Sequence, residues 1–193
     1  IKSVAVNGQS YEFAVDDKAQ ELTISAPQSA LGKAVVEIEF SGAITRPMHG
    51  LYPCFFEHNG KQKRLLATQF ESHHAREVFP CIDEPEAKAT FQLSLTTNKD
   101  DVVVSNTPVI NDELVGARKT TFFEPTPIMS TYLLAWVSGE LIYEEAISSH
   151  GVQVRTYATP VHAGKLAYSV EVACKSMDFM DDYFDIAYPL KKF

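Results

Sequence analysis

The most informative stretch of this chain for its fold is LLATQFESHHAREVFPCIDEP, residues 65–85. Successive side chains of an extended strand point to opposite faces, so one face is predicted to carry Leu65, Ala67, Gln69 and Glu71. That face turns from apolar to polar as the strand ends, which indicates that the strand leaves the core there. The amide of Gln69 and the carboxylate of Glu71 together suit a cationic group of a ligand.

Short segments with a hydrophobic period of two extend this pattern along the chain. They lie at residues 22–24, 36–40 and 89–95, and they predict half-buried antiparallel strands. Turn signals occur at Asn7-Gly8, which is predicted to join residues 4–6 to residues 11–15, and at residues 16–17, 32–33 and 98–101. A near-continuous apolar run at residues 128–137 predicts a central strand covered on both faces. The predicted fold is an all-β antiparallel sandwich.

The period changes after residue 160. Apolar residues recur at steps of three and four at Leu166, Val170, Ala173, Met177, Met180 and Phe184. This spacing predicts one C-terminal amphipathic helix over about residues 165–185, ending before Pro189.

Composition indicates an ordinary globular domain. The 193 residues are 45% hydrophobic and 22% charged, with a net charge of -8, which disfavours nucleic acid and anionic membranes as partners. The cysteines are odd in number, Cys54, Cys81 and Cys174, and lack Cys-x-x-Cys spacing. We therefore expect reduced thiols and a cytoplasmic location. The sequence shows neither an apolar run long enough to span a membrane nor a signal peptide.

Residues 65–85 resemble the signature of the zinc aminopeptidase family typified by aminopeptidase N, in which a Thr-Gln-Phe-Glu strand runs into an Ala-Arg pair and a Phe-Pro-Cys-x-Asp-Glu-Pro turn. Further matches follow the order of the family at residues 50–52, 129–139, 151–155 and 188–190. Two departures are local: Ser72-His73-His74 stands where the family commonly has Pro-Thr-Asp, and Glu77 stands in place of an Arg.

The resemblance implies a parent enzyme that removes N-terminal residues from peptides, with one zinc held by His-Glu-x-x-His and a more distant Glu. No two of the six histidines here have that spacing, so we expect neither catalytic residues nor metal ligands in this chain. The family implies that residues 1–159 are the saddle-like N-terminal β-sandwich domain, truncated at the front, and that residues 160–193 begin the catalytic domain. The chain is thus expected to be an inactive piece of a zinc-dependent enzyme.

By resemblance, Glu71 binds the free α-amino group of the substrate, and Gln69 lines the same pocket. An α-amino group has a pKa of about 8 and a Glu of about 4.3, so both groups are largely charged near neutral pH. From pattern alone, the favoured reading of Glu71 is a strand-end carboxylate in water, and only the resemblance reverses that preference. The pair His73-His74 reads as a surface pair without a third ligand, while Arg76 and Asp83 read as a structural ion pair or as caps of the turn.

Two functions of different classes follow. The first is the N-terminal domain of a zinc aminopeptidase, whose partners are peptides with a free N-terminus and the catalytic domain of the parent. The second is a non-catalytic binding or scaffold protein that keeps the β domain alone, because a fold does not imply a function.

Overall fold

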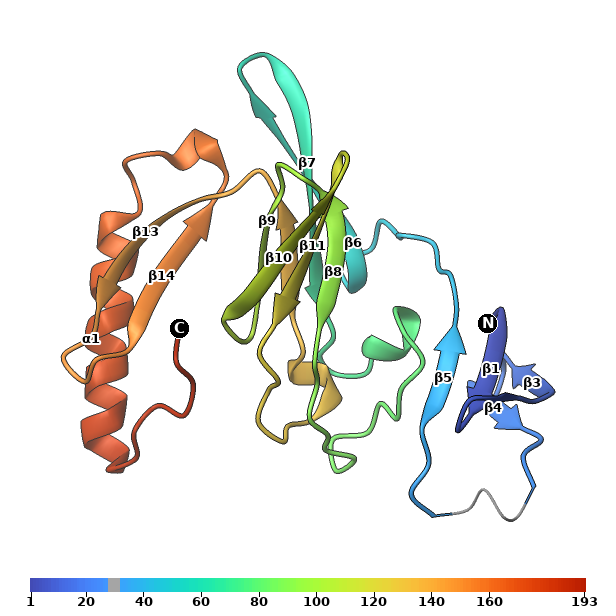
Figure 1. Ribbon diagram of the computed structural model, residues 1–193. Coiled ribbons are helices and arrows are strands. Elements are labelled where there is room, and N and C mark those ends of the chain that lie inside the picture. Colours follow the sequence, from blue (N-terminus) through green and yellow to red (C-terminus); the bar gives the residue numbers. More distant parts are fainter. Residues whose placement is uncertain (28–31) are drawn as a thin grey trace.

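The computed structural model describes residues 1–27 and 32–193. Its N-terminal part consists of two small antiparallel sheets (Figure 1). One has the order β2-β1-β5, formed by Gln9–Ser10, Ser3–Val6 and Val36–Glu39. The other is the hairpin of β3 (Phe13–Asp16) and β4 (Glu21–Ile24). Asn7 and Gly8 have φ of 51° and 79°, which confirms the predicted tight turn. The turn joins β1 to β2, whereas the predicted partner at residues 11–15 pairs with β4 instead.

Two larger sheets form the middle of the molecule. The four-stranded sheet has the order β6-β7-β12-β9, formed by Gly50–His58, Lys61–Gln69, Trp136–Gly139 and Val102–Ser105. The three-stranded sheet has the order β10-β11-β8, formed by Val109–Val115, Arg118–Phe123 and Ser94–Asn98. Figure 1 shows the second sheet lying across the first, and the hairpin of β6 and β7 extending beyond both.

A cluster of buried hydrophobic side chains forms the core between the two larger sheets, next to the end of β7. Its buried members are Phe70, Ala75, Leu134 and Trp136, with Phe91, Leu93 and Leu95 from the chain around β8 packed against them. The ring of Phe70 meets the ring of Trp136 edge to face, with centroids 5.4 Å apart. An aromatic pair of this kind stabilises by about 0.5–1.5 kcal/mol beyond its buried area. The cluster therefore fixes the backbone on both sides of Phe70.

Strand β12 approaches β7 very closely at Gly139. A Cβ there would lie 2.7 Å from the Cβ of Leu65, and the φ of Gly139 is 150°, so only glycine fits this position. Short loops carry single helical turns at η2 (Ala75–Glu77), η3 (Thr131–Leu133) and η4 (Pro160–His162).

The C-terminal part is a hairpin covered by the one α-helix. Strands β13 (Ile142–Ile147) and β14 (Gln153–Ala158) pair antiparallel, and α1 (Ala167–Phe184) packs on them. Leu166, Val170 and Met177 are buried at this contact, but Met180 and Phe184 of the predicted apolar stripe are exposed. The helix ends at Asp185, which adopts a left-handed conformation. The predicted class, antiparallel β-sheets followed by one helix, is confirmed.

Two strand predictions are wrong in detail. Residues 89–95 form only a bridge from Ala89 to Met129 before the ladder of β8 begins at Ser94. Residues 128–137 are not one strand: η3 interrupts them, and β12 begins at Trp136. The predicted central place is nevertheless correct, since β12 lies between β7 and β9. Within the described residues, no helix is both long enough and apolar enough to cross a membrane.

Candidate functional site

The predicted binding pair lies where β7 ends. Gln69 is the last residue of the strand and Glu71 lies two residues beyond it, in a turn, so the prediction that Glu71 continues the strand face is wrong. The reason is Phe70, which is 2% exposed and holds the chain in the core. The backbone N–H of His74 donates to the carbonyl of Phe70, 2.9 Å away, and closes the turn. Both predicted side chains are exposed to solvent.

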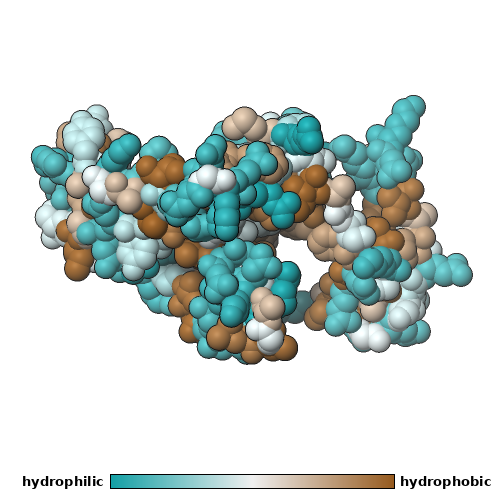
Figure 2. All heavy atoms as spheres, turned by 90° about the horizontal axis from the view of Figure 1, so that it is seen from above, coloured by the Kyte–Doolittle hydropathy of each residue, from teal (hydrophilic) through white to brown (hydrophobic). Residues whose placement is uncertain are grey.

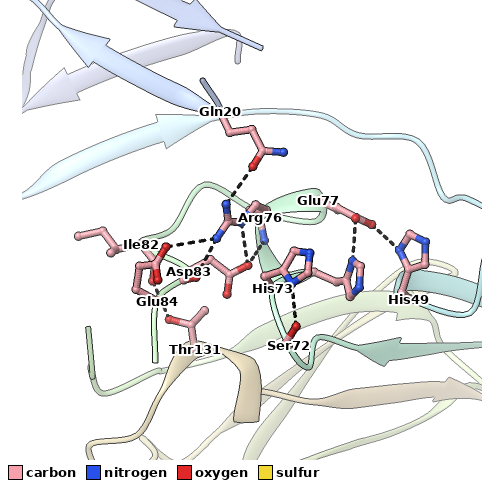
Figure 3. A network of polar contacts seen from close by, with 11 residues as sticks. Gln20, His49, Ser72, His73, Arg76, Glu77, Ile82, Asp83, Glu84 and Thr131 are labelled. Carbon is pink, nitrogen blue, oxygen red and sulfur yellow. Dashed lines mark hydrogen bonds and ion pairs between the residues drawn. The ribbon is translucent and has the colours of Figure 1, made fainter. Parts of the chain in front are cut away.

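The acidic turn after η2 is held by an ion pair in which the carboxylate is buried and the guanidinium is partly exposed. Oδ2 of Asp83 accepts hydrogen bonds from the backbone N–H of Arg76 at 3.1 Å and from its Nε at 3.2 Å (Figure 3). The same guanidinium donates to the carbonyl of Asp83 at 2.8 Å and to Oε1 of Gln20 at 2.9 Å. The Asp83 side chain is 2% exposed. Arg76 and Asp83 thus have the structural role that the sequence suggested, and they act as one unit.

The same turn is bound to the segment before β12. Oγ of Ser130 donates to the carbonyl of Pro85 at 2.5 Å, and Oγ1 of Thr131 donates to the carbonyl of Ile82 at 3.1 Å. All buried side-chain polar atoms of the described residues have a hydrogen-bond partner. The backbone that carries Glu71 is therefore held from the core side by Phe70 and from the turn by Arg76 and Asp83.

A cluster of side chains that the sequence did not bring together lies on the other side of Arg76. Nδ1 of His49 is 2.7 Å from Oε2 of Glu77, and Nδ1 of His74 is 2.8 Å from Oε1. Burial raises the pKa of Glu77, but the hydrogen bonds from His74 and His49 outweigh it and leave that pKa below its usual value. His73 stacks on His74, with ring centroids 4.7 Å apart.

This cluster was not predicted from the sequence because His49 stands 25 positions before His74, and the β6–β7 hairpin separates the two residues along the chain. The usable signal was the three-residue spacing of His74 and Glu77, which places both on one helical turn. The sequence predicts His73 and His74 as a surface pair without a third ligand. In the fold, His49 and Glu77 lie next to His74 and complete a group of three with it, whereas His73 is not part of that group. In the described residues this is the one group of three such side chains close enough to hold a metal ion.

The groove beside the acidic turn is a third feature. Figure 2 shows the surface hollowed between the N-terminal sheets and the rest of the molecule. A groove of about 400 Å³ there is lined by the β3–β4 hairpin and by residues 76–81 of the acidic turn, among them Cys81. Burial and the charge of Asp83 raise the pKa of the Cys81 thiol to about 11, so this thiol is inert near neutral pH. Cys54, Cys81 and Cys174 are all free.

Comparison with known proteins finds relatives along nearly the whole chain. Residues 1–133 match the family model of the peptidase M1 N-terminal domain. The chain is 42% identical over 194 residues to aminopeptidase N of Lactococcus lactis subsp. lactis, which covers 98% of this chain and 23% of that relative. It is 38% identical to aminopeptidase N of Lactobacillus helveticus over 98% of this chain and 22% of the relative.

A plant relative, aminopeptidase M1-A of Oryza sativa subsp. japonica, is 39% identical over 84% of this chain and 18% of its own length. The chain thus spans less than a quarter of the length of the curated relatives that it matches. Its matched part includes residues 65–85 and the whole of the predicted binding turn. With a family model over more than half of the chain and this degree of identity, the chain belongs to the aminopeptidase N family of M1 peptidases, as its N-terminal region.

Proposed function

We propose that this chain is the substrate-anchoring part of a zinc-dependent aminopeptidase and that Glu71 binds the free α-amino group of the peptide. The observation that carries the proposal is the place of Glu71: an exposed carboxylate directly after a core-anchored residue, in a chain 42% identical to an aminopeptidase N. Gln69, at the end of β7, lines the same pocket and adds an amide to it.

The rigidity of the turn supports this role. Binding energy is lost when a side chain must be ordered on association, so a carboxylate on a fixed backbone binds a cationic group more tightly than one on a loose loop. Phe70 is packed against Trp136 on one side, and Arg76 is paired with Asp83 on the other. The backbone that carries Glu71 is therefore fixed on both sides, which suits a group that measures the start of a peptide.

Hydrolysis belongs to the remainder of the parent. The sequence has no His-Glu-x-x-His, so the catalytic zinc and the water that it activates are assigned to a catalytic domain beginning near residue 160. Helix α1 has exposed side chains at Phe179, Met180 and Tyr183, and they form an apolar face that suits packing against the remainder of that domain. The three free cysteines support a reducing, cytoplasmic location.

The test is kcat/KM of the parent enzyme toward an aminoacyl amide. Glu71→Gln keeps the shape and removes the charge. Truncating one partner of a buried charged pair costs about 2–5 kcal/mol, so kcat/KM should fall by roughly thirtyfold or more. Glu86→Gln, an exposed residue of the acidic turn, is the control and should change it by less than about twofold. Full activity of Glu71→Gln would remove the anchor role, and an inactive wild-type parent would favour the scaffold function.

A further inference from the structure

Three side chains from two separate parts of the chain meet at the start of β6. His49 directly precedes that strand, His74 is the N-cap of η2, and Glu77 is the last residue of η2. The two imidazole rings stack with centroids 4.2 Å apart, and both direct Nδ1 at the same carboxylate. Figure 3 shows the carboxylate of Glu77 directed toward the ring of His49. All three ligand atoms lie within 4.8 Å of one another.

This donor set has the composition of a zinc site with one open position. Zinc accepts two imidazole nitrogens and a carboxylate oxygen, with water as the fourth ligand. Two nitrogen donors disfavour calcium and magnesium, which take oxygen ligands. The side chains of His49, His74 and Glu77 are 38%, 24% and 39% exposed, so an ion can enter from solvent and keep a water.

The distances fit with small adjustments. Zinc–ligand bonds of about 2.0–2.2 Å place tetrahedral donors about 3.4 Å apart. With Oε2 of Glu77 as the ligand, its separation from Nδ1 of His49, 2.7 Å, would open by about 0.7 Å. Nδ1 of His74, which is 2.8 Å from the other oxygen, Oε1, would turn toward the same ion. Gly50 leaves room beside the carboxylate, since a Cβ at that position would lie 3.1 Å from Oε2 of Glu77. Each neutral imidazole would carry its proton on Nε2 and present the Nδ1 lone pair to the ion.

We propose that His49, His74 and Glu77 form a zinc-binding site that joins the start of β6 to η2. The site is separate from the catalytic zinc of the parent, because this chain has no His-Glu-x-x-His, and it does not rest on the role of Glu71. It departs from the expectation that the chain holds no metal ligands, which considered spacing along the sequence alone. Bound zinc would cross-link two segments that are joined here by one hydrogen-bonded pair, His49 and Glu77, and by the stacked rings of His49 and His74.

The test is a calorimetric titration of the 193-residue chain with zinc chloride after treatment with a chelator. We expect saturable binding of one ion per chain. His49→Ala, His74→Ala and Glu77→Gln should each weaken it at least tenfold, whereas His162→Ala, an exposed histidine on η4, should leave it unchanged. Circular dichroism checks that each variant is folded.

If a histidine variant fails to fold, spectroscopy of the wild-type chain still tests the site. Cobalt(II) in the wild-type chain should give the visible absorption of a four-coordinate site, and zinc should abolish it by displacement. Nitrogen NMR should place the metal on Nδ1 of His49 and His74. The proposal is wrong if the chain shows no saturable zinc binding, or if His49→Ala and Glu77→Gln leave zinc binding intact. The three side chains would then be a hydrogen-bonded cluster without a metal.

Discussion

At the scale of single residues, the pair of Arg76 and Asp83 should carry much of the stability of the acidic turn. Removing one partner of a buried ion pair leaves the other uncompensated and costs about 3–5 kcal/mol. The variant Arg76→Met fills a similar volume without the charge, so we expect the free energy of unfolding to fall by about 3 kcal/mol, measured by urea denaturation.

The exposed pair of Lys2 and Glu39 gives the matched control. Both side chains are more than half exposed, at 54% and 65%, so Lys2→Met should change the free energy of unfolding by less than about 1 kcal/mol. Equal effects of Arg76→Met and Lys2→Met would show that the guanidinium does not hold the turn.

Cys81 provides a prediction that depends on pH. The thiolate is the reactive form, and the pKa of about 11 means that it appears only as the pH rises toward that value. At pH 8 about one thiol in a thousand is ionised, against about one in ten for a pKa of 9, so alkylation by iodoacetamide should be about a hundredfold slower. Mass spectrometry of the native and the denatured chain measures both rates. Equal rates at Cys81 in the two states would contradict the burial described here.

The sequence pattern locates the proposed binding turn but misplaces one of its side chains. The period of two correctly brings Gln69 to the end of a strand, yet it assumes that the strand continues to Glu71. Burial of Phe70 and the bond from His74 to its carbonyl end the strand first. The cluster of His49, His74 and Glu77 could not be predicted, because it depends on a contact between β6 and η2 that no local pattern encodes.

At the scale of elements, α1 should tolerate changes on one face and not on the other. Met177 is 6% exposed against the β13–β14 hairpin and Phe179 is 60% exposed. Met177→Ala should lower the free energy of unfolding by about 2–4 kcal/mol, since a buried methionine leaves a cavity. Phe179→Ala should cost less than about 1 kcal/mol.

Urea denaturation measures the free energy of unfolding of both variants, and sedimentation velocity measures their self-association. An exposed aromatic face favours self-association, so Phe179→Ala should associate less than the wild-type chain. If Phe179→Ala were the more destabilised of the two, the helix would be turned the other way on the hairpin.

The helix was predicted well from its period in the sequence, and segments set by side-chain bonds were not. The steps of three and four from Leu166 onward gave the helix to within about two residues, because burial on one face imposes that period. Residues 128–137 are apolar enough for a strand, but Ser130 and Thr131 bond to carbonyls of the acidic turn and bend the chain into η3. A hydrophobic pattern carries no information about such bonds.

At the scale of the whole molecule, the fold places an acidic side chain at the edge of a rigid body. The four-stranded sheet, the core around Phe70 and the fastened acidic turn all converge on the end of β7. The relatives are more than four times as long as this chain, and the aminopeptidase activity proposed here belongs to the complete parent. The central claim is that this end of β7 recognises the free amino group of a peptide.

This recognition can be measured through the inhibition constants of a peptide inhibitor and of its desamino analogue, determined for the zinc-loaded wild-type parent and for Glu71→Gln. This cycle isolates the coupling between the carboxylate and the amino group. The wild-type enzyme should prefer the free amino group by roughly thirtyfold or more, since a buried charged pair is worth about 2–5 kcal/mol, and the preference should largely vanish in Glu71→Gln. An unchanged preference in the folded variant would contradict the account.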